Sequence, residues 1–434
     1  MYLYSSLLQR ATEGNPVRIG LIGAGKFGSM FLSQVPTTPG IAVTVIADLD
    51  PAQAIMRCRE VGWDDSRVAG TEFIDDAEAM IREDKVDVVV EATGSPVAGI
   101  KHALLCISHG KHIVMVNVEA DVLVGPYLAQ QAQQAGVVYS MAYGDQPALT
   151  MEMIDWARSC GFNIVAAGKG TKYLPTYHES TPDTVWSHYG LSAEEAAAAG
   201  MRSQMFNSFL DGTKSGIEMA AIANAAGLDA PSNGLAFPPC SADNLAQVLR
   251  PQSVGGQLEF SGQVEVVSSL QRDGKPVDRD LRWGVYCVFE APNDYSAACF
   301  RQYGMNTDDS GRYSAMFKPF HLIGLELNIS ILSAALRGQP TGAPLDFKAD
   351  VVAVAKRDLK VDEVLDGEGG FTVWGRIMPA DASVSVQALP IGLASEVRLT
   401  RPVEKGQVVT LNDIDADTNM QAWQIREAML LAFT

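Results

Sequence analysis

Three glycines near the amino-terminus are spaced so that the chain can turn tightly and leave its backbone bare. Gly23, Gly25 and Gly28 form the pattern G-x-G-x-x-G, which lets a pyrophosphate approach the main chain and a helix pack closely on a strand. The apolar run 17–22 before them predicts that strand, and a helical pattern follows them. The free N–H groups at the start of the helix would face the phosphates of a dinucleotide. The predicted cofactor contacts here are Gly23, Gly25, Lys26, Phe27 and Gly28.

An acidic residue follows a second apolar strand. Residues 43–47 predict the strand, and Asp48 comes 20 residues after Gly28, where a carboxylate can accept both ribose hydroxyls of an adenosine. The same charge would repel a 2′-phosphate, which favours NAD over NADP. NADP stays open because Arg57 and Arg59 follow, although both lie a turn or more into the next helix. The alternative is a glycine turn in another kind of α/β protein, with Asp48 as a helix cap.

Strand and helix patterns alternate from residue 17 to about residue 143. Continuous apolar strands in such an alternation predict a parallel sheet covered by helices on both faces, the doubly wound Rossmann arrangement. Ligands bind at the carboxyl ends of its strands. Residues that follow two later strands are therefore expected to border the nicotinamide: Thr93, Gly94 and Asn117 as cofactor contacts, and Glu119 as a substrate contact.

Composition limits the partners of the chain. Its 434 residues allow two or three domains, and its formal net charge of −18 argues against nucleic acid and anionic membranes. No apolar stretch reaches the length of a membrane span, and the polar amino-terminus does not resemble a signal peptide. The six cysteines are scattered without C-x-x-C pairs, which is typical of free thiols. We expect a cytoplasmic protein with a small-molecule substrate.

Lysines in the middle of the chain are the predicted proton carriers. Hydride exchange between an alcohol and a carbonyl requires a group that moves the hydroxyl proton, and a lysine in a dry site can do this. Lys169 and Lys172 follow a predicted strand in a glycine-flanked loop, and Lys214 lies three residues after Asp211 near a helix start. Asp211 and Glu218 could orient such a lysine. The alternatives are ordinary surface lysines and a helix cap at Asp211.

A polar loop after these lysines is the predicted substrate contact. Its hydroxyl groups and aromatic rings suit a polyol, although an ordinary Thr-Pro-Asp turn is the alternative. His321 could meet a carboxylate or phosphate of the substrate, or could cap the apolar helix that follows it. No spacing matches a strong metal motif, so no metal ligand is assigned and a divalent ion stays undecided. The loop residues predicted to contact substrate are Tyr177, His178, Thr181 and Asp183.

The pattern changes twice along the chain. Residues 1–146 predict the dinucleotide-binding domain, residues 147–345 an α+β catalytic and oligomerisation domain, and residues 346–434 a small β-rich module. The last helix of the middle domain, at about 321–337, is expected to pack back on the first domain. Two strand runs between residues 264 and 289 predict a hairpin around the turn Asp273-Gly274-Lys275.

Local motifs resemble those of the homoserine dehydrogenase superfamily. The segment Phe209-Leu210-Asp211-Gly212-Thr213-Lys214 resembles the helix start that carries its catalytic pair, and Glu91-Ala92-Thr93-Gly94 resembles its nicotinamide-side strand end. The whole chain resembles the deoxyxylulose-phosphate reductoisomerase-like oxidoreductases with a C-terminal SAF domain, through stretches such as Ala167-Gly168-Lys169-Gly170 and Val352-Ala353-Val354-Ala355-Lys356. The resemblance implies a Rossmann domain, an α+β domain, a SAF domain at 346–434, and a homo-oligomer, either dimer or tetramer.

Two departures from that family bear on the reaction. Its members use NADPH and have basic residues where this chain has Asp48-Leu49-Asp50, and the segment 171–186 also differs. We therefore expect an NAD(P)-dependent oxidoreductase that acts on a CH–OH group of a small polyhydroxylated acid, sugar or sugar phosphate. The alternatives are a reductoisomerase that couples hydride transfer to skeletal rearrangement, and a dinucleotide-bound sensor without turnover.

Overall fold

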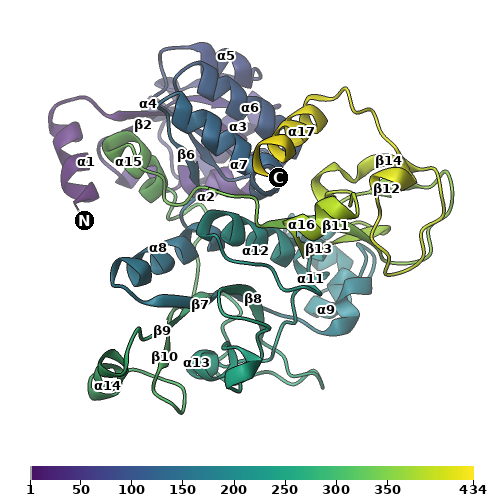
Figure 1. The fold of residues 1–434 in the computed structure, drawn as a ribbon. Coiled ribbons are helices and arrows are strands. Elements are labelled where there is room, and N and C mark those ends of the chain that lie inside the picture. Colours follow the sequence, from purple (N-terminus) through teal and green to yellow (C-terminus); the bar gives the residue numbers. More distant parts are fainter. Residues whose placement is uncertain (1) are drawn as a thin grey trace. The chain divides into compact units, whose positions relative to one another are not determined.

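The computed structural model describes residues 2–434, which form two compact units (Figure 1). The first unit holds the residues up to Leu149 together with His321–Leu345 and Ile425–Ala432, and the second holds Thr150–Phe320 and Asp346–Gln424. The divisions near 149 and 345 lie close to the expected domain boundaries. Residues 346–424, however, form part of the second unit instead of a third domain, because they pack against its central helix.

A six-stranded parallel sheet forms the core of the first unit, in the order β3-β2-β1-β4-β5-β6. The chain leaves β1 toward β2 on one side and later returns to β4 on the other, which creates the switch point where such sheets bind dinucleotides. The predicted doubly wound parallel sheet is confirmed. Its strands are β1 (Val17–Ile22), β2 (Ile41–Ala47), β3 (Glu72–Ile74), β4 (Val88–Glu91), β5 (His112–Met115) and β6 (Tyr139–Met141).

Helices cover this sheet because its central strands are buried along nearly their whole length and mostly apolar. The last helix of the expected middle domain, α15, lies against β4, β5 and β6. The helices of the unit are α1 (Leu3–Thr12), α2 (Lys26–Leu32), η1 (Val35–Thr37), α3 (Pro51–Glu60), α4 (Asp65–Ala69), α5 (Ala77–Arg82), α6 (Pro96–Ser108), α7 (Val118–Gln134) and α15 (Asn328–Arg337).

The carboxyl-terminal helix α17 (Gln421–Phe433) lies beside α7 (Figure 1). The guanidinium of Arg426 is buried and donates from Nη1 to the carbonyl oxygen of Leu123 at 2.9 Å. Pro126 interrupts the hydrogen bonds of this part of α7 because it has no N–H group. Arg426 therefore supplies a donor to a turn that the proline weakens. Residues 346–434 were expected to form one β-rich module, but the greater part of this helix, Ile425–Ala432, belongs to the first unit.

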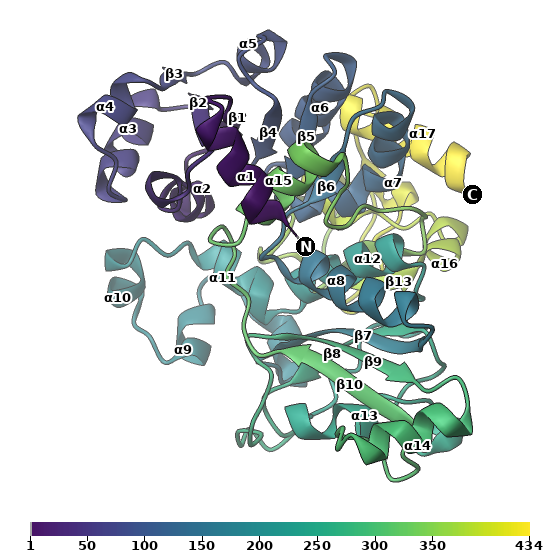
Figure 2. The same cartoon turned by 90° about the vertical axis from the view of Figure 1, so that its left-hand side faces the viewer.

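A mixed four-stranded sheet, in the order β10-β9-β7-β8, carries the second unit (Figure 2). The expected hairpin at 264–289 is wrong, because β8 and β9 lie on opposite sides of β7 and are not neighbours. The turn at 273–275 closes only an isolated bridge between Leu270 and Pro276. The strands are β7 (Asn163–Thr171), β8 (Gln263–Ser268), β9 (Val285–Glu290) and β10 (Tyr313–Lys318).

Helices lie on both faces of this sheet, with α12 on one face and α13 on the other (Figure 2). Helix α8 begins in the first unit and continues in the second. The helices of this region are α8 (Gln146–Ser159), η2 (Pro175–Glu179), α9 (Val185–Tyr189), α10 (Ala193–Ala198), α11 (Ser203–Leu210), α12 (Thr213–Ala226), η3 (Ala242–Asn244), α13 (Leu245–Val248), η4 (Gln252–Val254) and α14 (Asp294–Gln302).

The C-terminal strands pack on the other side of α12. Nearly every residue of α12 is buried, because the helix lies between β7 and β8 on one side and β11 and β13 on the other. Its many small side chains permit this close packing on both sides. The remaining elements are β11 (Ala349–Ala355), β12 (Val364–Asp366), β13 (Val373–Pro379), α16 (Ala380–Ser385), η5 (Ile391–Leu393), β14 (Ser395–Leu399), η6 (Leu411–Asp413) and β15 (Ile414–Asp415).

Candidate active site

The glycine loop after β1 has the geometry of a phosphate cradle. Gly23 has a φ of +91°, and a Cβ there would lie 2.8 Å from the carbonyl oxygen of Ala92. A Cβ at Gly28 would lie 2.4 Å from the carbonyl oxygen of Gly23, so the helix can approach the strand only without a side chain. At Gly25 a Cβ would meet no atom within 4 Å, which leaves space beside the bare backbone. The loop therefore fits the pyrophosphate of a dinucleotide.

Asp48 lies beside this loop, as predicted. Its Oδ2 accepts the backbone N–H of Ala24 at 2.7 Å, and its Oδ1 accepts that of Asp50 at 3.0 Å. Arg57 is closer to the loop than its sequence position suggested, since its Nη1 donates to the carbonyl oxygen of Ala24 at 2.7 Å. A long flexible side chain on the helix after β2 can return across one turn. Lys26 is exposed in the first turn of α2.

The segment after β4 holds further predicted contacts. Thr93 and Gly94 are exposed, and Gly94 has a φ of +71° with open space around it. Asn117 is buried instead of lining a surface, because it caps α7 by accepting the N–H of Ala120 at 3.1 Å. Its Nδ2 donates to the carbonyl oxygen of Ser95 at 2.7 Å. Asn117 thus joins the starts of α6 and α7.

Two predicted substrate contacts of the first unit lie near helix starts. Glu119 is half-buried in the first turn of α7. His321 is also half-buried, and its Nε2 lies 3.2 Å from Nε2 of Gln146 at the start of α8. The structure thus gives His321 a side-chain neighbour that the sequence did not indicate.

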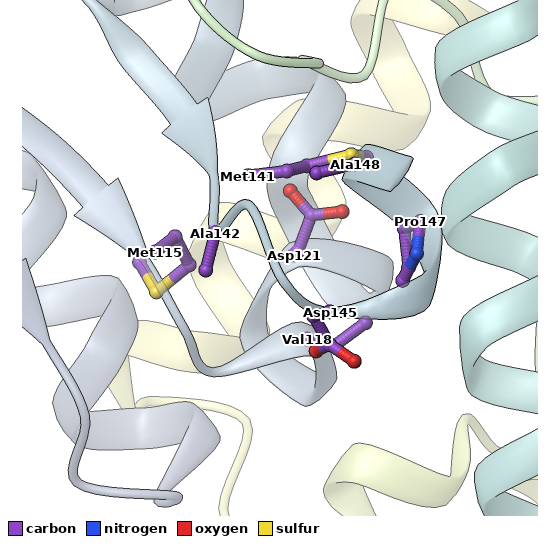
Figure 3. Close-up of a pocket in the computed structure, with 8 residues that line it drawn as sticks. All are labelled: Met115, Val118, Asp121, Met141, Ala142, Asp145, Pro147 and Ala148. Carbon is purple, nitrogen blue, oxygen red and sulfur yellow. The ribbon is translucent and has the colours of Figure 1, made fainter. Parts of the chain in front are cut away.

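A buried carboxyl group in α7 was missed by the sequence reasoning. Asp121 accepts the hydroxyl of Tyr139 at 2.9 Å, and burial raises the pKa of Asp121 to about 7. Figure 3 shows Asp121 between Met141 and Asp145 in a small pocket. Nothing in the sequence distinguishes a buried aspartate in a first helical turn from an exposed one. The pocket is lined by Met115, Val118, Asp121, Met141, Ala142, Asp145, Pro147 and Ala148.

The second unit contains a buried ion pair between a lysine and a glutamate. Lys169 lies on β7 and Glu218 on α12, with their side chains 7% and 3% exposed, and Nζ contacts Oε2. A Cβ at Gly168 would lie 1.9 Å from the carbonyl oxygen of Glu265, so the glycine allows β7 and β8 to approach. The predicted role of Glu218 as a partner for a lysine thus has a structural basis.

The other two candidate lysines have different surroundings. Lys172 donates to the carbonyl oxygen of His188, and its Nζ lies 5.7 Å from the ring centre of Tyr189. Burial lowers the pKa of Lys172, and the nearby Arg282 lowers it further. Lys214 is half-buried as the second residue of α12. The structure therefore assigns Lys172 and Lys169 different partners, although the sequence placed them in one loop.

Asp211 is paired with a lysine from the C-terminal strands. Its Oδ2 lies 2.8 Å from Nζ of Lys356, and its Oδ1 accepts the N–H of Thr213 at 2.9 Å. Burial raises the pKa of Asp211, whereas Lys356 holds it down in part. Lys356 also donates to the carbonyl oxygens of Ser180 at 2.8 Å and Gly370 at 2.7 Å. Sequence reasoning missed Lys356 as a partner, although a lysine directly after an apolar strand was a signal.

Two residues of the predicted substrate loop lie inside the unit. Tyr177 is buried in an apolar cluster. His178 donates from Nδ1 to the carbonyl oxygen of Asp211 at 2.7 Å, since a carbonyl can only accept, and Nε2 then accepts the hydroxyl of Tyr173 at 2.9 Å. Its ring stacks on Trp374 at 4.0 Å, and burial lowers its pKa. Both ring nitrogens therefore have partners within the protein, and neither is available to a substrate in this conformation.

The rest of that loop forms a local turn. The N–H of Thr181 donates to Oγ1 of Thr184 at 2.9 Å, and Asp183 is exposed. This geometry matches the alternative of a Thr-Pro-Asp turn. Among residues 2–434, no group of three or more histidine, cysteine or acidic side chains is arranged to hold a metal ion. Within the same residues, no helix is long and apolar enough to cross a membrane.

Two known domains match successive parts of the chain. Residues 23–141 match the NAD binding domain of homoserine dehydrogenase, and residues 144–327 match the catalytic domain of the oxidoreductase DRL. No curated protein sequence matches the chain.

Solved structures match with low scores. The 3-ketoreductase KijD10 from Actinomadura kijaniata, in complex with TDP-benzene and NADP, is 20% identical over 37% of this chain and 50% of its own, with a TM-score of 0.26. Homoserine dehydrogenase of S. aureus is 16% identical over 34% and 43%, with a TM-score of 0.24. A probable dehydrogenase from Thermotoga maritima is 12% identical over 75% and 90%, with a TM-score of 0.39.

The chain spans about half the length of KijD10 and of the S. aureus enzyme. At these TM-scores the three likenesses carry no conclusion about this chain. The two domain matches are more informative, because each covers one continuous part of the chain whose fold is described above. The first of them also includes the glycine loop. Residues 23–141 thus resemble an NAD-binding domain of homoserine dehydrogenase, and residues 144–327 resemble the catalytic domain of the oxidoreductase DRL.

Proposed function

We propose that this protein is an NAD-dependent oxidoreductase that interconverts an alcohol and a carbonyl on a small polyhydroxylated acid, sugar or sugar phosphate. The buried ion pair of Lys169 and Glu218 carries the proposal, since it lies in the part of the chain that matches an oxidoreductase catalytic domain. A bound nicotinamide dinucleotide would supply or accept the hydride. A side chain of the protein would donate or accept the proton.

Lys169 is suited to that task. As an ammonium group it can donate a proton to a carbonyl oxygen, and as a free amine it can take one from an alcohol. Glu218 holds the ammonium group in one orientation and stabilises its charge, an effect that is stronger away from water. In this role Glu218 is a positioning residue, and Lys169 is the group that meets the substrate.

Asp48 supports NAD as the cofactor. Its two oxygens are each fixed by a backbone N–H group, so the carboxylate is held beside the glycine loop. A 2′-phosphate there would meet this charge, whereas ribose hydroxyls could donate to it. Arg57 is the one observation that favours NADP, because its guanidinium also reaches the loop.

The test of the proton carrier uses matched lysine variants of the full chain. NADH formation is screened with polyhydroxylated acids, sugars and sugar phosphates, and Lys169→Met is then compared with Lys172→Met on the best substrate. Lys169→Met should lower kcat by about a hundredfold or more, the usual contribution of an acid–base group, while dinucleotide binding persists. Lys172→Met should keep turnover within severalfold. Unchanged turnover in Lys169→Met would refute the proposal.

Calorimetry with NAD and NADP tests the cofactor assignment. The native protein should prefer NAD, and Asp48→Ala should relax that preference. A native preference for NADP would overturn this assignment of Asp48 and favour the reductoisomerase alternative. Product analysis separates the two reactions, because rearrangement changes the carbon connectivity and simple oxidation does not.

We further infer a homo-oligomer, dimer or tetramer, and a SAF-like identity for residues 346–434. Exposed aromatic side chains on the second unit support assembly, with Trp283 61% and Phe317 36% exposed. Phe317 lies on β10, an edge strand of the sheet. Light scattering of the purified chain at several concentrations measures the oligomeric state.

A further inference from the structure

Glu91 is fully buried at the carboxyl end of β4, and its carboxyl group is hydrogen-bonded to the exposed residue Thr93. Its Oε1 accepts the hydroxyl of Thr93 at 2.5 Å and lies 3.3 Å from Nδ1 of His102. Its Oε2 is also buried and has no hydrogen-bond partner within the described residues. A buried carboxylate is costly, so its retention beside a surface loop calls for an explanation.

The bond from Thr93 to Glu91 fixes how the threonine can bind other groups. The hydroxyl of Thr93 donates to Oε1 of Glu91, so its single proton is committed to that oxygen. The oxygen Oγ1 of Thr93 accepts the N–H of Ser95 at 3.2 Å, which leaves one lone pair. Thr93 can therefore offer a ligand an acceptor but no donor.

Glu91 is not the only residue that holds the loop, although its Oε1 also accepts the backbone N–H of Thr93 at 3.4 Å. Asn117 already ties Ser95 to the start of α7 through a 2.7 Å bond, and the hydroxyl of Ser95 caps α6. Besides its long contact with the backbone of Thr93, Glu91 sets the direction of the Thr93 hydroxyl. Thr93 itself is exposed at the switch point of the sheet, beside the open space around Gly94.

We propose that Glu91 sets Thr93 as a hydrogen-bond acceptor for the carboxamide NH2 group of the nicotinamide dinucleotide. This inference rests on the proposed function, which places a dinucleotide on the first unit. Thr93 is then a binding residue, and Glu91 is a positioning residue that acts through it. The pair selects the carboxamide over groups of the same shape that lack an N–H donor.

Binding measurements on the full chain test the proposal without turnover. Calorimetry compares NAD with its 3-acetylpyridine analogue, in which a methyl group replaces the amide nitrogen. The affinity for ADP-ribose, which lacks the nicotinamide, measures binding by the rest of the cofactor site. The native protein should bind NAD about two- to tenfold more tightly than the analogue, the range expected for one hydrogen bond.

Three variants separate the roles of the two residues. Thr93→Val removes the acceptor, and Glu91→Met frees the hydroxyl to rotate and donate. In both variants the ratio of the affinity for NAD to the affinity for the analogue should fall close to one. Thr93→Ser keeps the hydroxyl and should keep the preference. ADP-ribose affinity should be unchanged in all three, which also shows that each variant folds.

The outcomes are distinguishable. If the native protein does not discriminate, or if Thr93→Val or Glu91→Met still prefers NAD, the inference is wrong. If ADP-ribose and NAD both fail to bind the native chain, the proposed cofactor site itself is wrong.

Discussion

Replacing Lys356 with methionine should strongly destabilise the second unit. The side chain of Lys356 is only 2% exposed, and its ammonium group joins three segments through Asp211, Ser180 and Gly370. Methionine has a similar length but no charge and no donor. The variant therefore leaves the carboxylate of Asp211 buried without its partner, since Asp211 is fully buried.

The size of the effect follows from the groups left behind. Removing one member of a buried ion pair costs about 3–5 kcal/mol, mostly because the remaining charge is dehydrated. The carbonyl of Ser180 adds little, because it keeps the Nδ2 donor of Asn207 at 3.1 Å. Oδ1 of Asp211 also keeps the N–H of Thr213. We expect a loss of about 3–5 kcal/mol in the free energy of unfolding at neutral pH.

The loss should depend on pH in a defined direction. Burial already raises the pKa of Asp211 in the native protein, so between its ordinary pKa and the raised one the folded chain binds more protons than the unfolded chain. The free energy of unfolding falls as the pH rises through that window. Without Lys356 the pKa of Asp211 rises further, which extends the window upward. The deficit of the variant should therefore grow from acid to neutral pH.

Urea unfolding followed by tryptophan fluorescence and far-ultraviolet circular dichroism measures these differences. Trp374 is a suitable reporter, because it stacks on His178 next to the ion pair. The double variant Asp211→Asn with Lys356→Met is the matched control, since it removes both charges and should recover much of the lost stability. A loss below about 1 kcal/mol for Lys356→Met, or a double variant less stable than the single one, would contradict the reasoning.

Three further changes test other parts of the first unit. Gly28→Ala places a Cβ 2.4 Å from the carbonyl oxygen of Gly23 and should cost about 1–3 kcal/mol, with weaker NAD-induced stabilisation in thermal melts. Arg426→Met removes the donor to Leu123 and should raise hydrogen exchange throughout α17, whereas unchanged protection would show that apolar packing alone holds the helix. Burial raises the pKa of Asp121 from 3.8 to about 7, so stability should fall as the pH rises through the interval between these two values, and Asp121→Asn should flatten that dependence in unfolding titrations.

The cofactor half of the chain could be predicted because its requirements are local. A positive φ at Gly23, bare backbone at Gly25 and a close helix at Gly28 each demand glycine at a fixed spacing. Continuous apolar strands that alternate with helices admit few arrangements besides a parallel sheet. Asp48 then lies near the loop because neighbouring parallel strands end at the same edge.

The sequence also indicated which residue types could carry chemistry in the second unit, but not which of them meet. Lys169 and Lys172 are three residues apart, yet one pairs with Glu218 on α12 and the other with the carbonyl of His188. That choice depends on where β7 ends and on what covers each side of it. His178 looked equally available in the sequence until the fold engaged both its nitrogens.

Long-range pairing was decided by the tertiary structure alone. The hairpin expected around residues 273–275 failed because β7 lies between β8 and β9, and no local turn signal reports a strand inserted from elsewhere. Asp211 pairs with Lys356, far along the chain, because α12, which begins just after Asp211, packs against β11, which ends just before Lys356. Local sequence determines backbone conformation through sterics and through the periodicity of apolar residues. The partner of a buried charge, in contrast, depends on which residues the tertiary packing brings close to it.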